Sequence, residues 1–184
     1  MTLTDDLERI ALAAAPFAAP GERVAGILAA EPLDLGRIYL VAYEADGRGH
    51  GWLALDGEGR PVESRRAVRE AVSIAALCEV AEETAGGGDL PELRARLAEI
   101  RETESPEGIE EAEEAAAALA ATLEAEPRLA STDYLDRIGV AARRLEQALG
   151  DDAGSPFAAA MQQALPAVDE VAAEVERRYR GPLA

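Results

Sequence analysis

Residues 37–56 read RIYLVAYEADGRGHGWLALD, and this stretch decides the fold. β-branched and aromatic residues dominate its first part, 37–45, and apolar residues fall on both faces there, which favours a strand. Gly51 to Asp56 predicts a second strand. A connection of about four or five residues around Asp46–Gly49 would join the two strands. The stretch therefore predicts a β-hairpin.

The segments on either side extend this hairpin. Asp56-Gly57 is a further turn signal, and it leads to a short edge strand at Arg60–Val62, because proline inside a sheet is tolerated only at an edge. Upstream, Arg23–Ala30 fits a first strand or a continued helix equally well. The pattern predicts an antiparallel meander of two or three strands, which must pack on helices to be stable.

Helices are expected before and after this meander. Thr4 is a plausible N-cap for an N-terminal helix that ends at Pro16. Ser64 can cap a helix from Arg65 to about Ala85, whose middle is apolar nearly all round, as in a buried helix. Proline and glycine signals then delimit further helices, the last of which Pro166 should kink or split. Their expected ranges are 89–100, 106–126, 131–149 and 156–180.

Strands cluster near the N-terminus and helices follow, which predicts an α+β fold rather than α/β. The N-terminal helix and the small antiparallel meander would pack on a bundle of about five helices. We expect a single domain, 1–184. A boundary at 86–88 is the alternative, dividing a helix–hairpin–helix unit, 1–85, from a helical bundle, 89–184.

Composition narrows the function classes. The formal net charge is −18, and every basic residue is arginine, since the chain contains neither lysine nor asparagine. This charge argues against nucleic acid and against an anionic membrane surface, and it favours a partner with a basic surface. No basic leader and no apolar run approaching the roughly 18 residues of a membrane span is present, so the cytoplasm is the expected compartment.

Few residues carry chemistry. No phosphate-binding glycine loop, nucleophile elbow or Cys/His metal set is present, and a lone Cys78 inside an apolar helix is expected to be a core residue. His50 lies between two glycines, and Tyr39, Tyr43 and Trp52 share the predicted sheet. If these aromatic residues faced outward, they would form a ligand or partner surface.

Two carboxylate pairs with helical spacing are the one arrangement that suggests catalysis. Glu79 and Glu82 are three apart on one helix, and Asp133 and Asp136 repeat the spacing on another. If the pairs faced each other they could bind Mg²⁺ through oxygen ligands. The four positions are similar to the Glu-x-x-Glu … Glu-x-x-Asp pattern of all-α nucleotide pyrophosphohydrolases of the MazG type. The second pair here is Asp-x-x-Asp, and the β-hairpin does not belong to that fold.

The sequence thus favours a non-catalytic interaction or adaptor protein that self-associates through its helices or its sheet edge, with no cofactor. A Mg²⁺-dependent hydrolase of phosphorylated substrates, built on the carboxylate pairs, is one alternative. The other is a small-molecule binding module, with a pocket between the sheet and the buried helix lined by Trp52, Tyr43 and Ile74.

Overall fold

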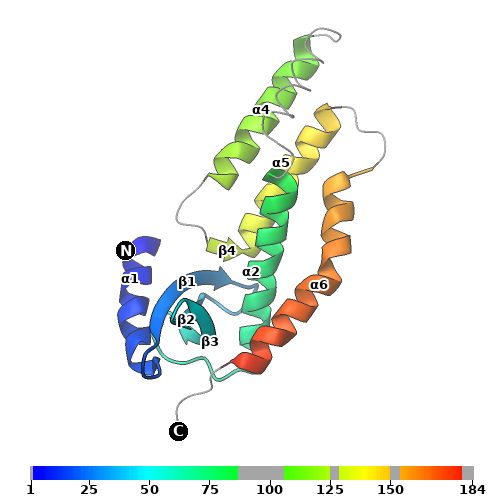
Figure 1. Ribbon diagram of the computed structural model, residues 1–184. Coiled ribbons are helices and arrows are strands. Elements are labelled where there is room, and N and C mark those ends of the chain that lie inside the picture. The colour runs from blue at the N-terminus through cyan, green and yellow to red at the C-terminus, as the bar shows by residue number, and fades with distance from the viewer. Residues whose placement is uncertain (1, 87–105, 125–128, 150–153, 180–184) are drawn as a thin grey trace. The chain divides into compact units, whose positions relative to one another are not determined.

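The computed structural model describes residues 2–86, 106–124, 129–149 and 154–179. In these ranges, three of the four strands follow one another near the N-terminus and most of the helices come after them, which confirms the α+β class (Figure 1). The helix expected over 89–100 lies outside the described residues. Within the described ranges, no helix combines the length and the apolar composition that crossing a bilayer requires.

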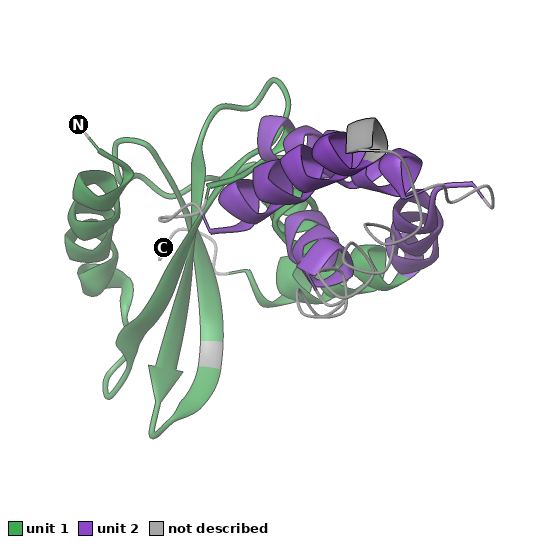
Figure 2. Cartoon of the chain, turned by 90° about the horizontal axis from the view of Figure 1, so that it is seen from above, with its two compact units in different colours: residues 1–76, 127–132, 167–184 green, residues 77–126, 133–166 purple. Residues whose placement is uncertain are grey.

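The chain divides into two compact units, each assembled from separate segments (Figure 2). Unit 1 comprises residues 1–76, 127–132 and 167–184, and unit 2 comprises residues 77–126 and 133–166. The expectation of one domain, with 86–88 as an alternative boundary, stays a prediction, and residues 87 and 88 lie outside the described ranges.

Unit 1 contains a four-stranded sheet in the order β3-β2-β1-β4. The strands are β1 (Arg23–Glu31), β2 (Ile38–Ala45), β3 (Arg48–Asp56) and β4 (Leu129–Ser131). The first three form the expected antiparallel meander, so the ambiguous segment after Glu22 is a strand. β4 joins β1 in parallel and makes the sheet mixed.

The connection between β2 and β3 is shorter than the sequence suggested. Only Asp46 and Gly47 lie between the strands, and their φ angles of 52° and 74° are both positive, as a type I′ turn requires. β3 therefore begins at Arg48 instead of Gly51. The ladder shifts register between Tyr43 opposite Gly51 and Glu44 opposite Gly49, so His50 occupies a bulge in β3.

One face of the sheet packs against α1 (Leu3–Ala14). Alternate residues of β2 and β3 point to this face and form a core with Ile10 and Ala14 of the helix. The Tyr43 hydroxyl donates a hydrogen bond of 2.8 Å to the carbonyl oxygen of Ala14. Thr2, and not Thr4, caps the helix, because Thr2 and Asp5 form a capping box in which each side chain accepts from the other's backbone N–H.

The other face of the sheet is buried too, including Leu40 and Ala54. Figures 1 and 2 show the unit 1 parts of α2 (Arg65–Gly86) and α6 (Pro156–Arg178) on the side of the sheet away from α1. Ser64 caps α2 as expected, since its Oγ accepts from the N–H of Ala67 at 3.2 Å. α6 continues through Pro166 without being split.

The outer edge of β3 is covered by two short contacts. The strand expected at Arg60–Val62 is reduced to a single antiparallel bridge between Pro61 and Leu55. Beyond the end of α6, Tyr179 makes a parallel bridge to Trp52, and its hydroxyl donates to the carbonyl of Val62. These contacts occupy backbone groups that an open sheet edge would leave exposed.

Unit 2 is helical. It contains α4 (Pro106–Leu123), nearly all of α5 (Thr132–Ala148), the second part of α2 and the first part of α6. Its buried apolar residues repeat at helical spacing, as in Ala112, Ala115 and Leu119 of α4. Glu146 of α5 accepts hydrogen bonds from the Ser155 hydroxyl at 2.6 Å and from the N–H of Phe157 at 2.7 Å, which caps the start of α6.

Candidate interaction surface

The aromatic residues of the hairpin do not gather on one surface. Tyr39 and Tyr43 are each 1% exposed and belong to the core beneath α1. Trp52 is half-buried on the opposite face of the sheet, because it pairs with Ala42 while its neighbour Leu53 points to the α1 core. The predicted pocket lined jointly by Trp52, Tyr43 and Ile74 is therefore not formed by these side chains. His50 lies in the bulge of β3, and its side chain is outside the described atoms.

The four carboxylates proposed as metal ligands also face different ways. Glu79 is exposed, whereas Glu82 is half-buried and accepts a 2.7 Å hydrogen bond from the Tyr134 hydroxyl. Successive residues of a helix are turned by about 100°, so Asp133 and Asp136 point away from the direction of Tyr134. Among the described residues, no group of three or more His, Cys, Asp or Glu side chains could hold a metal ion. The metal site stays a prediction that this geometry does not favour.

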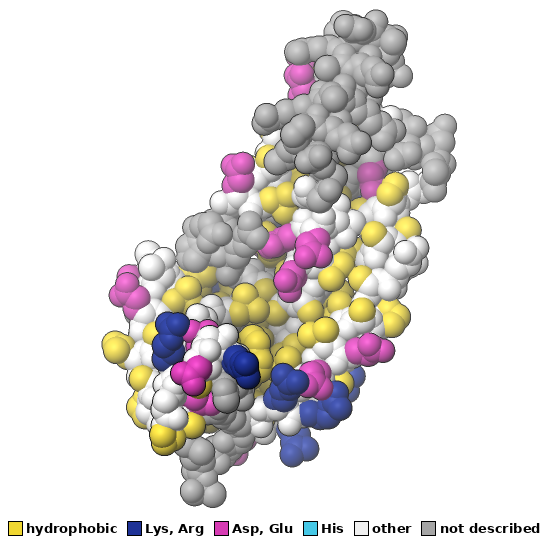
Figure 3. Space-filling model, in the orientation of Figure 1, with side chains coloured by type: hydrophobic (Ala, Val, Ile, Leu, Met, Phe, Trp, Pro, Cys, Tyr) yellow, Lys and Arg dark blue, Asp and Glu magenta, His cyan; other side chains and the backbone are white. Residues whose placement is uncertain are grey.

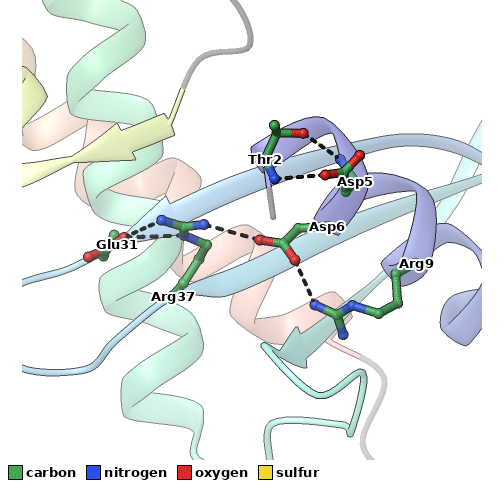
Figure 4. Close-up of polar contacts among 6 residues, drawn as sticks. All are labelled: Thr2, Asp5, Asp6, Arg9, Glu31 and Arg37. Atoms are coloured by element: carbon green, nitrogen blue, oxygen red, sulfur yellow. Dashed lines mark hydrogen bonds and ion pairs between the residues drawn. The ribbon is translucent and has the colours of Figure 1, made fainter.

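A polar network that sequence reasoning missed lies at the start of α1 (Figure 4). Arg37 donates to Glu31 at 3.2 Å and to Asp6 at 3.4 Å, and Asp6 also accepts from Arg9 at 3.0 Å. Burial alone would lower the pKa of Arg37, but hydrogen bonds to Tyr39 and Glu31 outweigh it and raise that pKa. Every charge in the network has an opposite partner, so its effect is to fix α1 against the strand ends.

A groove lies between α4 and α5 in unit 2. Its volume is about 290 Å³, and its α4 wall consists of Ala115, Ala118 and Thr122. The α5 wall follows a helical stripe with exposed members at positions 133, 136, 137, 140 and 144. Small side chains thus line the α4 wall, and longer, mostly charged side chains line the α5 wall.

The charges along this stripe are divided by position. Asp133 and Asp136 lie toward the N-terminal end of α5 and Arg144 toward the C-terminal end, the arrangement that the helix dipole favours. Arg137 pairs with Asp133 at 3.1 Å and lies 5.7 Å from the ring centroid of Tyr134. Asp136 and Arg144, in contrast, have no hydrogen bond or ion pair with any described residue.

Between these two charges lies Val140, whose side chain is 45% exposed at the middle of the stripe. An apolar centre flanked by charged groups resembles the anatomy of protein interfaces. On the face drawn in Figure 3, acidic side chains lie next to apolar ones. The spacing 136, 140 and 144 is visible in the sequence, but there Asp136 stands out only as a candidate metal ligand.

Comparisons with known proteins assign no family. No family model matches the chain, and no curated protein or solved structure matches it. The similarity to pyrophosphohydrolases of the MazG type remains limited to the four carboxylate positions.

Proposed function

We propose that this chain is a non-catalytic interaction protein, and that the α4–α5 groove is its binding surface. The observation that carries the proposal is the exposed Val140 between two charges, Asp136 and Arg144, that no described residue neutralises. A charged group on the rim of an apolar surface contributes to orientation and specificity when a partner supplies the opposite charge.

The shape of the groove supports a macromolecular partner over a small ligand. Its volume of about 290 Å³ is at the lower end of ligand pockets, which are commonly about 300–1,000 Å³. The α5 stripe runs from Asp133 to Arg144, or about 16 Å of helix axis at 1.5 Å per residue. An elongated groove with alanine on one wall fits a helix laid along it.

Site-specific photocrosslinking tests the proposal. A benzoylphenylalanine at Val140 should give a discrete protein adduct when the protein is irradiated in the cells that produce it. The same group at Leu12, which is 77% exposed but lies on α1 in unit 1, is the matched control and should give none of that adduct. Identical adduct patterns at both positions, or no adduct at Val140, would count against the groove as a binding surface.

The hydrolase and the small-molecule module remain alternatives without an observation in their favour. The four carboxylates point in different directions, and Trp52 and Tyr43 lie on opposite faces of the sheet.

A further inference from the structure

We infer that the partner in the groove is a second copy of this chain, which forms a two-fold dimer with the two α5 helices antiparallel and crossing at Val140. This inference rests on the proposed function and names its partner. It uses residues of unit 2 only, and all of them lie on α4 or α5.

Two-fold symmetry makes the pairing specific. In an isologous interface, residue i of one subunit contacts residue j of the other, and j contacts i. If the axis passes through Val140, residues equally distant from it along α5 meet across the interface. Asp136 lies four residues before Val140 and Arg144 four residues after it, so Asp136 meets the partner subunit's Arg144. Symmetry then produces this ion pair twice.

The same symmetry selects the antiparallel arrangement. A parallel pair of α5 helices would place Asp136 beside Asp136 of the partner subunit, and Arg144 beside the partner's Arg144. Like charges at these distances repel, whereas the antiparallel pair neutralises all four groups. The two groups that have no intramolecular partner among the described residues are thus the two that the dimer would pair.

One pair of like charges would oppose the dimer, but an ion pair within each chain weakens this repulsion. The antiparallel pairing brings Arg137 near Arg143 of the partner subunit, which lies three residues beyond Val140. Arg137 already forms an ion pair with Asp133 at 3.1 Å, and this reduces the repulsion. At the centre, Val140 packs on the partner's Val140, and Ala118 leaves room for the second helix to approach.

Charge reversal tests the pairing. Asp136→Arg and Arg144→Asp each place like charges opposite each other twice, so each should weaken dimerisation at least about 30-fold. The double variant D136R/R144D restores opposite charges and should dimerise like the wild type. An equimolar mixture of the two single variants should form a heterodimer, because one supplies two arginines and the other two aspartates.

Sedimentation equilibrium at micromolar concentration provides the readout, with a dimer at twice the 19.3 kDa of one chain. Glu170→Arg is the matched control for Asp136→Arg, since it makes the same change in net charge at an exposed position of α6 outside the groove. It should leave the dimer intact. Circular dichroism of every variant distinguishes a broken interface from a broken fold.

A cysteine supplies a second, independent measurement. A residue on a two-fold axis faces its own copy, so Val140→Cys should form a disulfide-linked dimer under mild oxidation. The native Cys78 is 3% exposed and should not crosslink in the wild type. A wild-type chain that remains monomeric, or single variants that dimerise normally, would overturn the inference. A Val140 photo-adduct containing a different protein would then leave the proposed function standing.

Discussion

Substituting Gly59 by alanine should destabilise unit 1 more than an alanine at any other described loop glycine. Gly59 lies in the turn after β3 with a φ of +81°, and a Cβ added there would be 2.7 Å from the Cβ of Ala13 on α1. Carbon atoms pack best at about 3.5–4.0 Å, so the turn and α1 would have to separate by about 1 Å. This contact adds to the cost of a positive φ.

Two other glycines separate these contributions. Gly36 has a φ of +68° with no atom within 4 Å of the position that a Cβ would take, and Gly57 has neither a positive φ nor a close neighbour. A positive φ costs a non-glycine residue about 1–2 kcal/mol, and the loss of unfolded-state entropy returns about 0.4–1 kcal/mol. We expect Gly57→Ala to be neutral or slightly stabilising, Gly36→Ala to lose about 1 kcal/mol, and Gly59→Ala to lose about 2–4 kcal/mol through overpacking.

Urea unfolding followed by tryptophan fluorescence measures these differences. Trp52 is the only tryptophan in the chain and lies in β3, so its emission reports on unit 1. The unfolding midpoint should be highest for Gly57→Ala, lower for Gly36→Ala and lowest for Gly59→Ala. The slope of the free energy of unfolding against urea concentration should be similar in all three. A Gly59→Ala midpoint equal to that of Gly36→Ala would refute the reasoning, because it would mean that α1 does not limit the space beside the turn.

Other predictions concern hydrogen bonds and protonation. Tyr43→Phe leaves the Ala14 carbonyl without its 2.8 Å donor and should cost about 1–3 kcal/mol in the same unfolding assay. Burial would raise the pKa of Asp56, but hydrogen bonds from the backbone N–H groups of Arg60 and Glu58 and from the Arg60 side chain lower it below 3.8. The ionised carboxylate therefore stabilises the fold at neutral pH. The difference in free energy of unfolding between wild type and Asp56→Ala should shrink as the pH falls through that lowered pKa, because the wild-type carboxyl group becomes protonated. Glu146→Ala removes the acceptor of the Phe157 N–H, whereas Ser155 still caps the N–H of Ala158, so the substitution should speed amide exchange at Phe157, measured by hydrogen–deuterium exchange, for a cost of about 1 kcal/mol. Millimolar Mg²⁺ should leave the melting temperature unchanged, since bound metal would raise it.

Local signals in the sequence predict much of the fold. The strand at 38–45 follows from its β-branched and aromatic residues, and the strand predicted at 51–56 is present but begins at Arg48. The Ser64 cap of α2 follows from the chemistry of helix N-termini. The sequence prediction missed Thr2 as a cap, although Asp5 three residues later completes the capping box. The predicted turn after Ala45 is too long because the glycine at position 49, next to His50, indicates a loop. In the structure both residues belong to β3, and a bulge at His50 accommodates the additional residue.

Features that depend on distant contacts could not be predicted in this way. β4 has only three residues, too few for any periodicity, and it is a strand because it pairs with β1 from far away in the sequence. Alternation along β2 and β3 places Tyr43 and Trp52 on opposite faces, but the covering of both faces emerges only in the packed sheet. The groove likewise depends on how α4 and α5 pack.

The sheet of unit 1 has a consequence for the order of synthesis. β4 and Tyr179 belong to the same unit as the hairpin, although the residues of unit 2 come between them in the chain. The meander can form early during translation. β4, which pairs with β1, follows residues 77–126 of unit 2, and Tyr179, which bridges to Trp52, follows all of unit 2. If translation stalled between α5 and the end of α6, β3 would lack its bridge from Tyr179 and part of its outer edge would be uncovered. Exposed strand edges and incompletely packed chains are prone to aggregation. The sheet of unit 1 would then be complete only after α6 has been translated.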